Sequence, residues 1–333
     1  MKGKKIILVL GCLVVITILL VLFKHDSMVN ESQTLVLADA NQPAFSLIYL
    51  AEEQGYFSEN NLDVEYIEYS SGRDALNAVI AGDADIATCF ETPVVIQTLN
   101  GETLNIITEL HTSTKNNGIL ARIDSGIFKP EDLRGKTIAV TTNSGAEFVA
   151  HTLLNEGGLT PGDVEWVNAL PTEMVGLLES GEVDAIATWN PHIINARESI
   201  GAENVRAFHT SQLKELSMAV GLSTFVENNP ELLSVFLESL IQAEIFFEEN
   251  PEEAKQIISE RFPEQDPVVL EEILSYTSFE IRLSNTLSTV LENEAIWFDI
   301  FSDDVEGQLD VDAVLFEDYL MGIDPKRVTH LLN

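Results

Sequence analysis

The sequence predicts an α/β protein built from two similar lobes. Short apolar runs alternate with helix-like segments from Thr34 to Phe225, and one acidic turn occurs twice, each time followed by a short apolar run. The 333-residue length also exceeds that of an ordinary single domain. Beyond Pro230 the pattern becomes mainly helical. We therefore expect two sheet-centred lobes and a helical C-terminal region.

Residues 1–24 predict a membrane anchor or a signal segment. Three lysines near the N-terminus precede an apolar run from Ile6 to Phe23, which Lys24 closes. The run reaches the lower end of the length that spans a bilayer, and no small-residue cleavage site follows it, which favours a retained transmembrane helix over a cleaved signal. The positive flank places the N-terminus in the cytoplasm and the body outside.

A lipoprotein is the alternative for this segment. Val9–Cys12 loosely resembles a lipobox, and Cys12 would then carry the lipid. The polar residues 25–33 after the anchor are expected to be a linker. The three outcomes, cleavage, lipidation and retention, stay open.

Charge limits the classes of partner. The formal net charge is −36, and the first 24 residues hold four of the 18 basic side chains and no acidic one. Such an acidic body excludes nucleic acid as a partner, and an anionic ligand would need focused local donors such as a helix N-terminus or an arginine. A saline habitat and lineage are two explanations of this acidity.

The order of elements follows from periodicity and turn residues. The strands are expected at 34–38, 63–69, 86–89, 104–109, 119–122, 137–141, 164–167, 185–189 and 218–225. The helices are expected at 44–54, 73–81, 148–156, 231–249, 251–262, 267–276 and 287–301, with a last acidic segment at 310–322.

One stretch of sequence is repeated within the chain. Ala81–Cys89 is answered by Ser180–Trp189, and with one residue inserted both give a glycine stop, an acidic turn and a strand that ends in threonine. A simple acidic turn is the alternative for either copy alone. Two copies with matching strands predict two similar lobes, with ligands held in the cleft beyond their strand ends.

Two motifs resemble a known family. Lys129–Val140 is similar to the K-P-x-D-L-x-G-K-x-I-A-V segment of two-lobed periplasmic binding proteins. Gln54–Phe57 with Asn61–Val64 resembles their G-Y-F and G-L-x-V opening, with Asn61 where glycine is usual. The nearest branch is the nitrate/sulfonate/taurine-binding group, which includes binders of thiamine precursors.

This resemblance implies a type II periplasmic binding protein-like fold and a role in transport. Lobe 1 would comprise residues 34–118 and 226–333, and lobe 2 residues 119–225, with crossings near 117–122 and 223–227. The protein would be a monomer that captures a small molecule for the permease and ATPase subunits of an ABC importer. It would need no cofactor and no metal. Sulfonates, taurine, nitrate and pyrimidine precursors are the solutes that the resemblance suggests.

The segment 141–147 is the sharpest candidate for ligand binding, because it follows a strand and opens a helix. Free backbone amides there, with the Ser144 hydroxyl, suit a sulfonate, phosphate or carboxylate. The resemblance also assigns this loop to the anion of the ligand. Ordinary N-capping by Ser144 or Thr142 is the alternative. The candidate residues are Thr142, Asn143, Ser144, Gly145 and Ala146.

Two polar turns of lobe 1 add further candidates. Ser71, Gly72 and Arg73 lie at a helix start, where Arg73 is the one arginine near the expected mouth, with a solvated surface role as the alternative. Asn41 and Gln42 follow the first strand, where the family also contacts its ligand.

The two copies of the repeat lead into the remaining candidates. Glu91 and Thr92 occupy the loop after the first copy, where Glu91 would pair with an ammonium group if it faces the cleft. A solvated loop acid is the alternative. Trp189 and Asn190 end the second copy, where the indole would cover the apolar part of a ligand or belong to the core.

An enzyme is not expected. The chain lacks a nucleophile elbow, a P-loop, a dinucleotide fingerprint and an HExxH signature. Cys12 lies in the anchor and Cys89 stands alone, so the body has neither a disulfide nor a cysteine metal site. Two other functional interpretations are a sensory ectodomain with a separate signalling partner and a lyase or synthase of the same fold.

Overall fold

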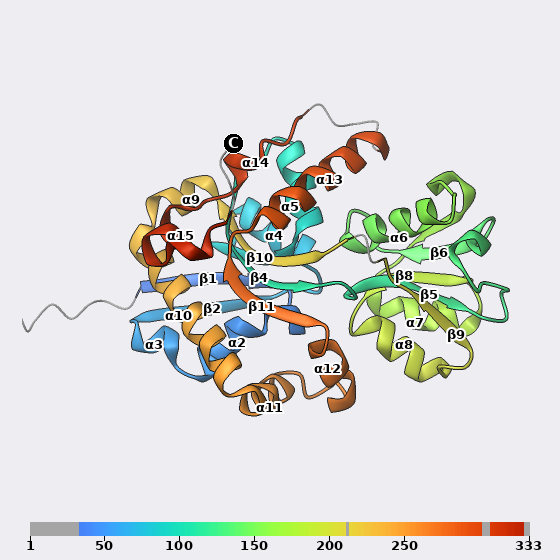
Figure 1. Cartoon of the computed structure of the whole chain (residues 1–333), viewed down its shortest axis with the longest axis horizontal. Helices are drawn as coiled ribbons and strands as arrows, with labels where there is room; N and C mark the ends of the chain where they lie inside the picture. The colour runs from blue at the N-terminus through green and yellow to red at the C-terminus, as the bar shows by residue number, and fades with distance from the viewer. Residues whose placement is uncertain (1–32, 211–212, 302–306, 330–333) are drawn as a thin grey trace, which may run out of the picture. The chain divides into compact units, whose positions relative to one another are not determined.

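The computed structural model describes residues 33–210, 213–301 and 307–329. In these residues the strands form two sheets, one with the order β11-β4-β10-β3-β1-β2 and the other with the order β7-β6-β8-β5-β9. We call the first sheet and its helices the first lobe, and the second sheet and its helices the second lobe (Figure 1). The predicted two-lobed α/β class is confirmed.

The elements have the following bounds. The strands are β1 Gln33–Asp39, β2 Leu62–Glu68, β3 Ile86–Phe90, β4 Leu104–Ser113, β5 Asn117–Arg122, β6 Thr137–Val140, β7 Glu165–Asn168, β8 Ala185–Trp189, β9 Val205–Phe208, β10 Glu215–Leu222 and β11 Thr277–Arg282. The main helices are α2 Ser46–Glu53, α4 Gly72–Ala81, α5 Glu91–Leu99, α6 Gly145–Glu156, α7 Pro171–Ser180, α8 His192–Ile200, α10 Pro230–Glu249, α11 Pro251–Arg261, α12 Pro267–Leu274 and α13 Asn285–Phe301. Short helices are α3 Tyr56–Glu59, α9 Ser223–Asn228, α14 Val311–Val314 and α15 Asp318–Ile323.

The first lobe is centred on a mixed sheet with a buried middle. β3 pairs in parallel with β1 and antiparallel with β10, which also pairs antiparallel with β4. Seven of the eight residues of β10 are buried, as expected for a central strand covered on both faces. One apolar core cluster joins this sheet to the helices that cover it.

The second lobe has a smaller sheet with a core on each face. β6 pairs in parallel with β7 and β8, and β5 pairs antiparallel with β8 and β9. One apolar cluster includes Val149 and Leu153 of α6, and the other includes Met174 and Leu178 of α7. The second lobe therefore has helices packed on both faces of its sheet.

The sequence repeat marks equivalent turns in the two lobes. Gly82 and Gly181 both end a helix in the left-handed conformation, at φ 81° and 75°. The carboxylate of Asp85 accepts the Val36 amide at 2.8 Å, and that of Asp184 accepts the Thr137 amide at 3.0 Å. Gly82 and Gly181 are 99 residues apart, and so are Asp85 and Asp184, so the one-residue insertion assumed between the two copies is wrong. In the correct register Phe90 is equivalent to Trp189.

The chain passes between the lobes at points that differ from the expected ones. It leaves the first sheet after Ser113 and enters the second at Asn117, and it returns between Phe208 and Glu215. The expected crossings at 117–122 and 223–227 are instead β5 and α9. The boundary at residue 225 placed β10 in lobe 2, and this is corrected because β10 pairs with β3 and β4.

Several elements were not predicted from the sequence, among them α5, α8, β9 and β11. Glu91 and Thr92 begin helix α5 instead of a loop, since Pro93 is tolerated in the first turn of a helix. β11 interrupts the helical C-terminal region as an edge strand with Phe279 and Ile281 buried. β9 is a four-residue edge strand with little apolar alternation.

Asn61 explains one departure from the family motif. It adopts φ 58°, in the left-handed region that favours glycine, and asparagine is among the few other residues that adopt it. The motif is therefore conformationally intact.

The predicted anchor or signal segment 1–24 lies outside the described residues, as does nearly all of the predicted linker 25–33. Across residues 33–210, 213–301 and 307–329, no helix combines the length and apolarity needed to cross a bilayer.

Candidate functional site

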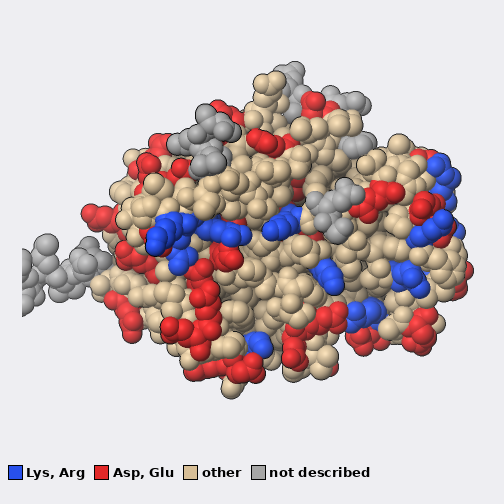
Figure 2. All heavy atoms as spheres, viewed as in Figure 1, with Lys and Arg blue, Asp and Glu red and all other residues tan. Residues whose placement is uncertain are grey.

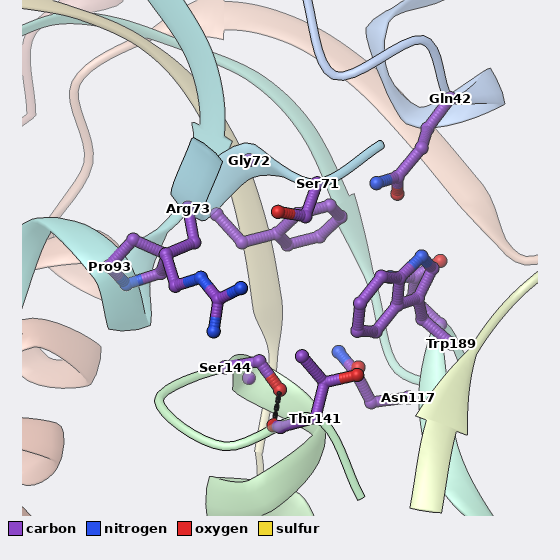
Figure 3. Close-up of a pocket in the computed structure, with 12 residues that line it drawn as sticks. Gln42, Ser71, Gly72, Arg73, Pro93, Asn117, Thr141, Ser144 and Trp189 are labelled. Atoms are coloured by element: carbon purple, nitrogen blue, oxygen red, sulfur yellow. Dashed lines mark hydrogen bonds between the residues drawn. The ribbon is translucent and has the colours of Figure 1, made fainter. Parts of the chain in front are cut away.

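A cavity lies between the two lobes at the carboxyl ends of their strands (Figure 3). Its volume is about 40 Å³, counted as the space open to the centres of water molecules, so it admits only a small guest. The lining residues from the first lobe and the crossing are Gln42, Ser71, Gly72, Arg73, Phe90, Pro93, Asn116 and Asn117, and those from the second lobe are Thr141, Ser144, Gly145 and Trp189.

The start of α4, which comprises Ser71, Gly72 and Arg73, forms the first-lobe wall. The Ser71 hydroxyl caps the helix by accepting the Asp74 amide at 3.2 Å. Gly72 is required by space, because a Cβ there would lie 2.8 Å from Cys89 Cα. The helix N-terminus is therefore held against β3.

Arg73 brings a cation to this wall. Its guanidinium points into the cavity in Figure 3, and Nη1 donates to the Thr142 carbonyl of the second lobe at 3.0 Å. Nε contacts the Asp74 carboxylate at 3.3 Å. Arg73 thus links the two lobes and leaves further N–H groups for an anion.

The start of α6, which comprises Ser144, Gly145 and Ala146, forms the opposite wall. The amides of Glu147 and Phe148 both donate to the Ser144 carbonyl, so the amides of Gly145 and Ala146 are the first donors of this helix without an intrahelical acceptor. The Ser144 hydroxyl donates to the Thr141 carbonyl at 2.6 Å and does not cap the helix. Its oxygen can still accept a hydrogen bond.

Aromatic and apolar groups close the remaining sides. Trp189 ends β8 with only 7% of its surface exposed, and Phe90 ends β3 at the equivalent position of the first lobe. Phe90 is fixed by edge contacts with Phe45 and His111. An indole face and a phenyl ring suit a compact organic group beside the anion.

Two buried amides of the cavity wall lack partners. The Gln42 carbonyl oxygen and the Asn116 amide nitrogen are buried and form no hydrogen bond with any described residue. A buried polar group without a partner is costly, so these two groups favour a polar guest in the cavity.

Half of the sequence-predicted residues line this cavity. They are Gln42, Ser71, Gly72, Arg73, Ser144, Gly145 and Trp189. The others do not line it. The Asn41 side chain donates to Glu68, and the Asn143 backbone amide donates to Glu147. The Thr142 carbonyl accepts from Arg73, and the Asn190 side chain donates to the Lys115 carbonyl and to the Tyr276 hydroxyl. Ala146 follows Gly145 within α6.

Glu91 and Thr92 also lie outside the lining. The Glu91 carboxylate is buried and accepts the Leu216 amide at 3.2 Å, so it does not face the cavity as a partner for an ammonium group. Both residues belong to the first turn of α5.

The sequence analysis missed Phe90, Pro93, Asn116 and Asn117. Thr141, which also lines the cavity, lay within the predicted segment 141–147 but was not among the individual candidates. Phe90 could have been found by aligning Asp85 with Asp184, because the constant spacing then sets Phe90 against Trp189. Asn116 is the last residue of the crossing and Asn117 is the first residue of β5.

No three His, Cys, Asp or Glu side chains of the described residues converge in a metal-binding arrangement.

The chain is similar in sequence to known proteins. A family model described as NMT1/THI5 like matches residues 42–254. The putative aliphatic sulfonates-binding protein of Bacillus subtilis is 25% identical over 240 residues, which cover 71% of this chain and 72% of the relative. The taurine-binding periplasmic protein of Escherichia coli is 26% identical over 225 residues, which cover 67% and 69%.

A solved structure shares the fold. The alkanesulfonate-binding protein of Xanthomonas axonopodis pv. citri, bound to MOPS, superposes with a TM-score of 0.73 at 19% identity and covers 86% of this chain and 99% of its own.

Proposed function

The chain belongs to the NMT1/THI5-like family, and from that premise we propose that it is an extracytoplasmic solute-binding protein that captures a small oxyanion between its lobes. The observation that carries this proposal is the pair of helix N-termini at the starts of α4 and α6, which face one cavity from the two lobes. Helix N-termini offer amide donors and a positive dipole end to an anion.

The cavity wall carries several hydrogen-bond donors that can bind an anion. Arg73, the free first-turn amides and the Asn116 amide nitrogen can all donate, while Figure 2 shows acidic side chains spread over the visible face of both lobes. Because the protein as a whole repels anions, concentrated local donors are the feature that an anion-binding site needs.

The aromatic walls favour an organic anion. Trp189 and Phe90 would pack on a short carbon chain while the anionic group meets the two helix starts. Aliphatic sulfonates, including taurine, combine both parts, and two relatives are named for such ligands. Nitrate and pyrimidine precursors are the other solutes to compare.

Capture would proceed by closure of the lobes. A guest held by both helix starts adds contacts to each lobe and shifts the population toward the closed form, which the Arg73 contact to the Thr142 carbonyl already favours. The closed form would then deliver the solute to the permease and ATPase subunits of an ABC importer. The body would stand outside the cell, tethered through residues 1–24 or through a lipid on Cys12.

The protein would return its ligand unchanged. The cavity wall offers hydrogen-bond donors and aromatic faces, and none of its described side chains pairs a nucleophile with a base. Mass analysis of ligand recovered after incubation would reveal any chemical conversion.

A panel experiment tests the proposal. Ethanesulfonate, taurine, nitrate and a formylaminopyrimidine are titrated into the soluble body by calorimetry, and ethanesulfonate or taurine is expected to bind. Trp189→Ala is expected to weaken binding at least tenfold, while Glu253→Ala on the exposed face of α11 leaves it unchanged. Absence of binding by every compound, or equal affinities of the two variants, would count against the site.

A further inference from the structure

Three glutamates are buried together beside the cavity. Glu91 comes from α5, Glu215 from β10 and Glu294 from α13, and they are only 4%, 4% and 1% exposed. The Glu91 carboxylate accepts the amide of Leu216, the neighbour of Glu215, and α13 packs on α5, so the three side chains lie close together. The charge of Glu91 raises the pKa of Glu215 and of Glu294, and the charge of Glu215 raises that of Glu294. We call them the glutamate cluster.

The cluster has hydrogen bonds but no cation. Glu215 accepts the Asn117 backbone amide at 2.8 Å and also its side-chain amide, and Glu91 accepts the Leu216 amide. Both oxygens of Glu294 lack a hydrogen bond, although the Thr92 hydroxyl lies beside them. No lysine, arginine or histidine of the described residues forms an ion pair with any of the three.

Burial without a counter-ion favours the protonated state. Desolvation raises the pKa of Glu215 to about 8, with a further contribution from Glu91. The same cause raises the pKa of Glu91 and of Glu294. Three neighbouring carboxylates cannot all be ionised in such a site, so the closed protein holds protons there at neutral pH.

Other titratable groups around the cluster supply no positive charge. Burial raises the pKa of the Cys89 thiol and of the Tyr276 hydroxyl, which keeps both neutral. Burial lowers the pKa of His111, which bonds Ser217 on β10, to about 3, and it also lowers the pKa of His209, which bonds the Asn117 carbonyl. Arg73 faces the cavity and pairs with Asp74.

The cluster is covered by parts of both lobes. A Cβ on Gly145, at the start of α6, would lie 3.5 Å from the Thr92 hydroxyl and 3.4 Å from the Asn117 side-chain amide. Helix α13, which carries Glu294, also reaches α6, where Trp297 packs on Phe148 and His151. Separation of α6 from these contacts would admit water to the carboxyls through the cavity.

We propose that capture of an anionic solute is coupled to uptake of protons by the glutamate cluster, an inference that rests on the proposed function. Closure removes the three carboxyls from water in the same step that brings an anion to the start of α6. Protons on the cluster cancel the negative charge that would otherwise oppose that anion.

The sign of the pH dependence follows from linkage. An open, hydrated carboxyl has a pKa of about 4.3, whereas the closed state raises that of Glu215 to about 8. The bound state therefore holds more protons, so affinity is greatest at low pH and is lost as pH rises through this window. Each linked proton contributes up to about a tenfold loss of affinity per pH unit.

The test is calorimetric titration of ethanesulfonate into the soluble body between pH 5 and 9. Ethanesulfonate stays ionised throughout, so any proton taken up belongs to the protein. Heats are measured at pH 7.5 in Tris and in triethanolamine, two cationic buffers that do not compete as oxyanions. They are expected to differ by the difference between the ionisation heats of the two buffers for each proton taken up. Glu294→Gln, which has the same shape and breaks no hydrogen bond, should reduce the uptake and flatten the pH profile, and Glu91→Gln serves as a second variant.

The outcomes separate the two proposals. Glu253→Gln, an exposed glutamate on α11, should leave uptake and pH profile unchanged. Binding with equal heats in the two buffers and a flat pH profile would overturn the proton coupling and leave the binding function standing. Absence of ethanesulfonate binding at every pH would overturn the anion-binding function, and the coupling with it.

Discussion

The starts of α4 and α6 use the same residue types but differ in helix capping and in how tightly the glycine packs. Both place a serine and a glycine at a helix N-terminus that faces the cavity. At α4 the serine caps its own helix and the glycine touches β3, whereas at α6 the serine hydroxyl donates to a preceding carbonyl and the glycine has ordinary contact distances. A formal cation, Arg73, is present only at α4 among the lining residues.

This difference suggests that the two helix starts contribute differently to ligand binding. The start of α4 is fixed to the core of the first lobe and carries the charge, so it can act as a rigid base for the ligand. The start of α6 keeps its serine oxygen free to accept, and Gly145 there faces the Thr92 side chain of the first lobe. Because the neighbouring Thr142 carbonyl bonds Arg73 of the first lobe, the start of α6 is suited to closing on a ligand that the first lobe already holds.

The largest expected effect is loss of the cation. Arg73→Met should weaken ethanesulfonate binding by about ten- to a hundredfold, since a hydrogen bond to a charged group contributes roughly 1.5–3 kcal/mol. Calorimetry measures the change. Arg206→Met, at an exposed position of β9, is the matched control, and an equal loss in both variants would refute the role of Arg73.

The paired glycines should differ in stability. Gly72→Ala should lower the free energy of unfolding by about 1–3 kcal/mol, because its Cβ would overlap the backbone of Cys89. Gly145→Ala should have little effect or a small gain, because alanine favours a helix by roughly 0.5–1 kcal/mol. Urea unfolding of both variants measures this, and equal destabilisation would contradict the proposed difference in packing.

Substitution of the paired serines should affect stability at α4 and binding at α6. Ser71→Ala should cost about 1 kcal/mol of stability through loss of the N-cap, whereas Ser144→Ala should leave the cap of α6 unchanged and act on binding instead. Urea unfolding and calorimetry on the same two proteins separate stability from affinity. Loss of stability in Ser144→Ala alone would reverse the assignment.

The smallest expected effect concerns a contact between the lobes. Trp297 on α13 donates from Nε1 to His151 Nδ1 on α6 at 3.1 Å. Trp297→Phe keeps a ring and removes this hydrogen bond, so about 1 kcal/mol is lost from the closed form and affinity falls about fivefold.

A matched variant separates closure from general stability. Trp166 Nε1 donates to the Pro161 carbonyl at 3.0 Å within the second lobe. Trp166→Phe should lower the stability of that lobe without changing affinity. Equal affinity loss in both variants would show that the Trp297 contact does not report closure.

The α/β class and the elements that lead into the cavity were predictable because they follow local rules. Alternating or continuous apolar runs set the strands, and Ser-Gly pairs marked the starts of α4 and α6. Gln42, Arg73 and Trp189 were found for the same reason, since each lies at or near the boundary of a predicted element.

The remaining features depend on contacts between distant segments. Asn116 and Asn117 become part of the cavity wall only because the chain crosses between the sheets there. Glu91 looked like a loop acid, yet its burial depends on β10 and α13, which follow it by more than a hundred residues. Local sequence carries no signal for contacts between such distant segments.

A crystal structure of the soluble body grown with ethanesulfonate tests the central claim most directly. We expect the sulfonate oxygens within hydrogen-bond distance of the backbone amides at the starts of both α4 and α6, with the ethyl group against Trp189. A sulfonate bound to one lobe alone, or found outside the cavity, would contradict the account.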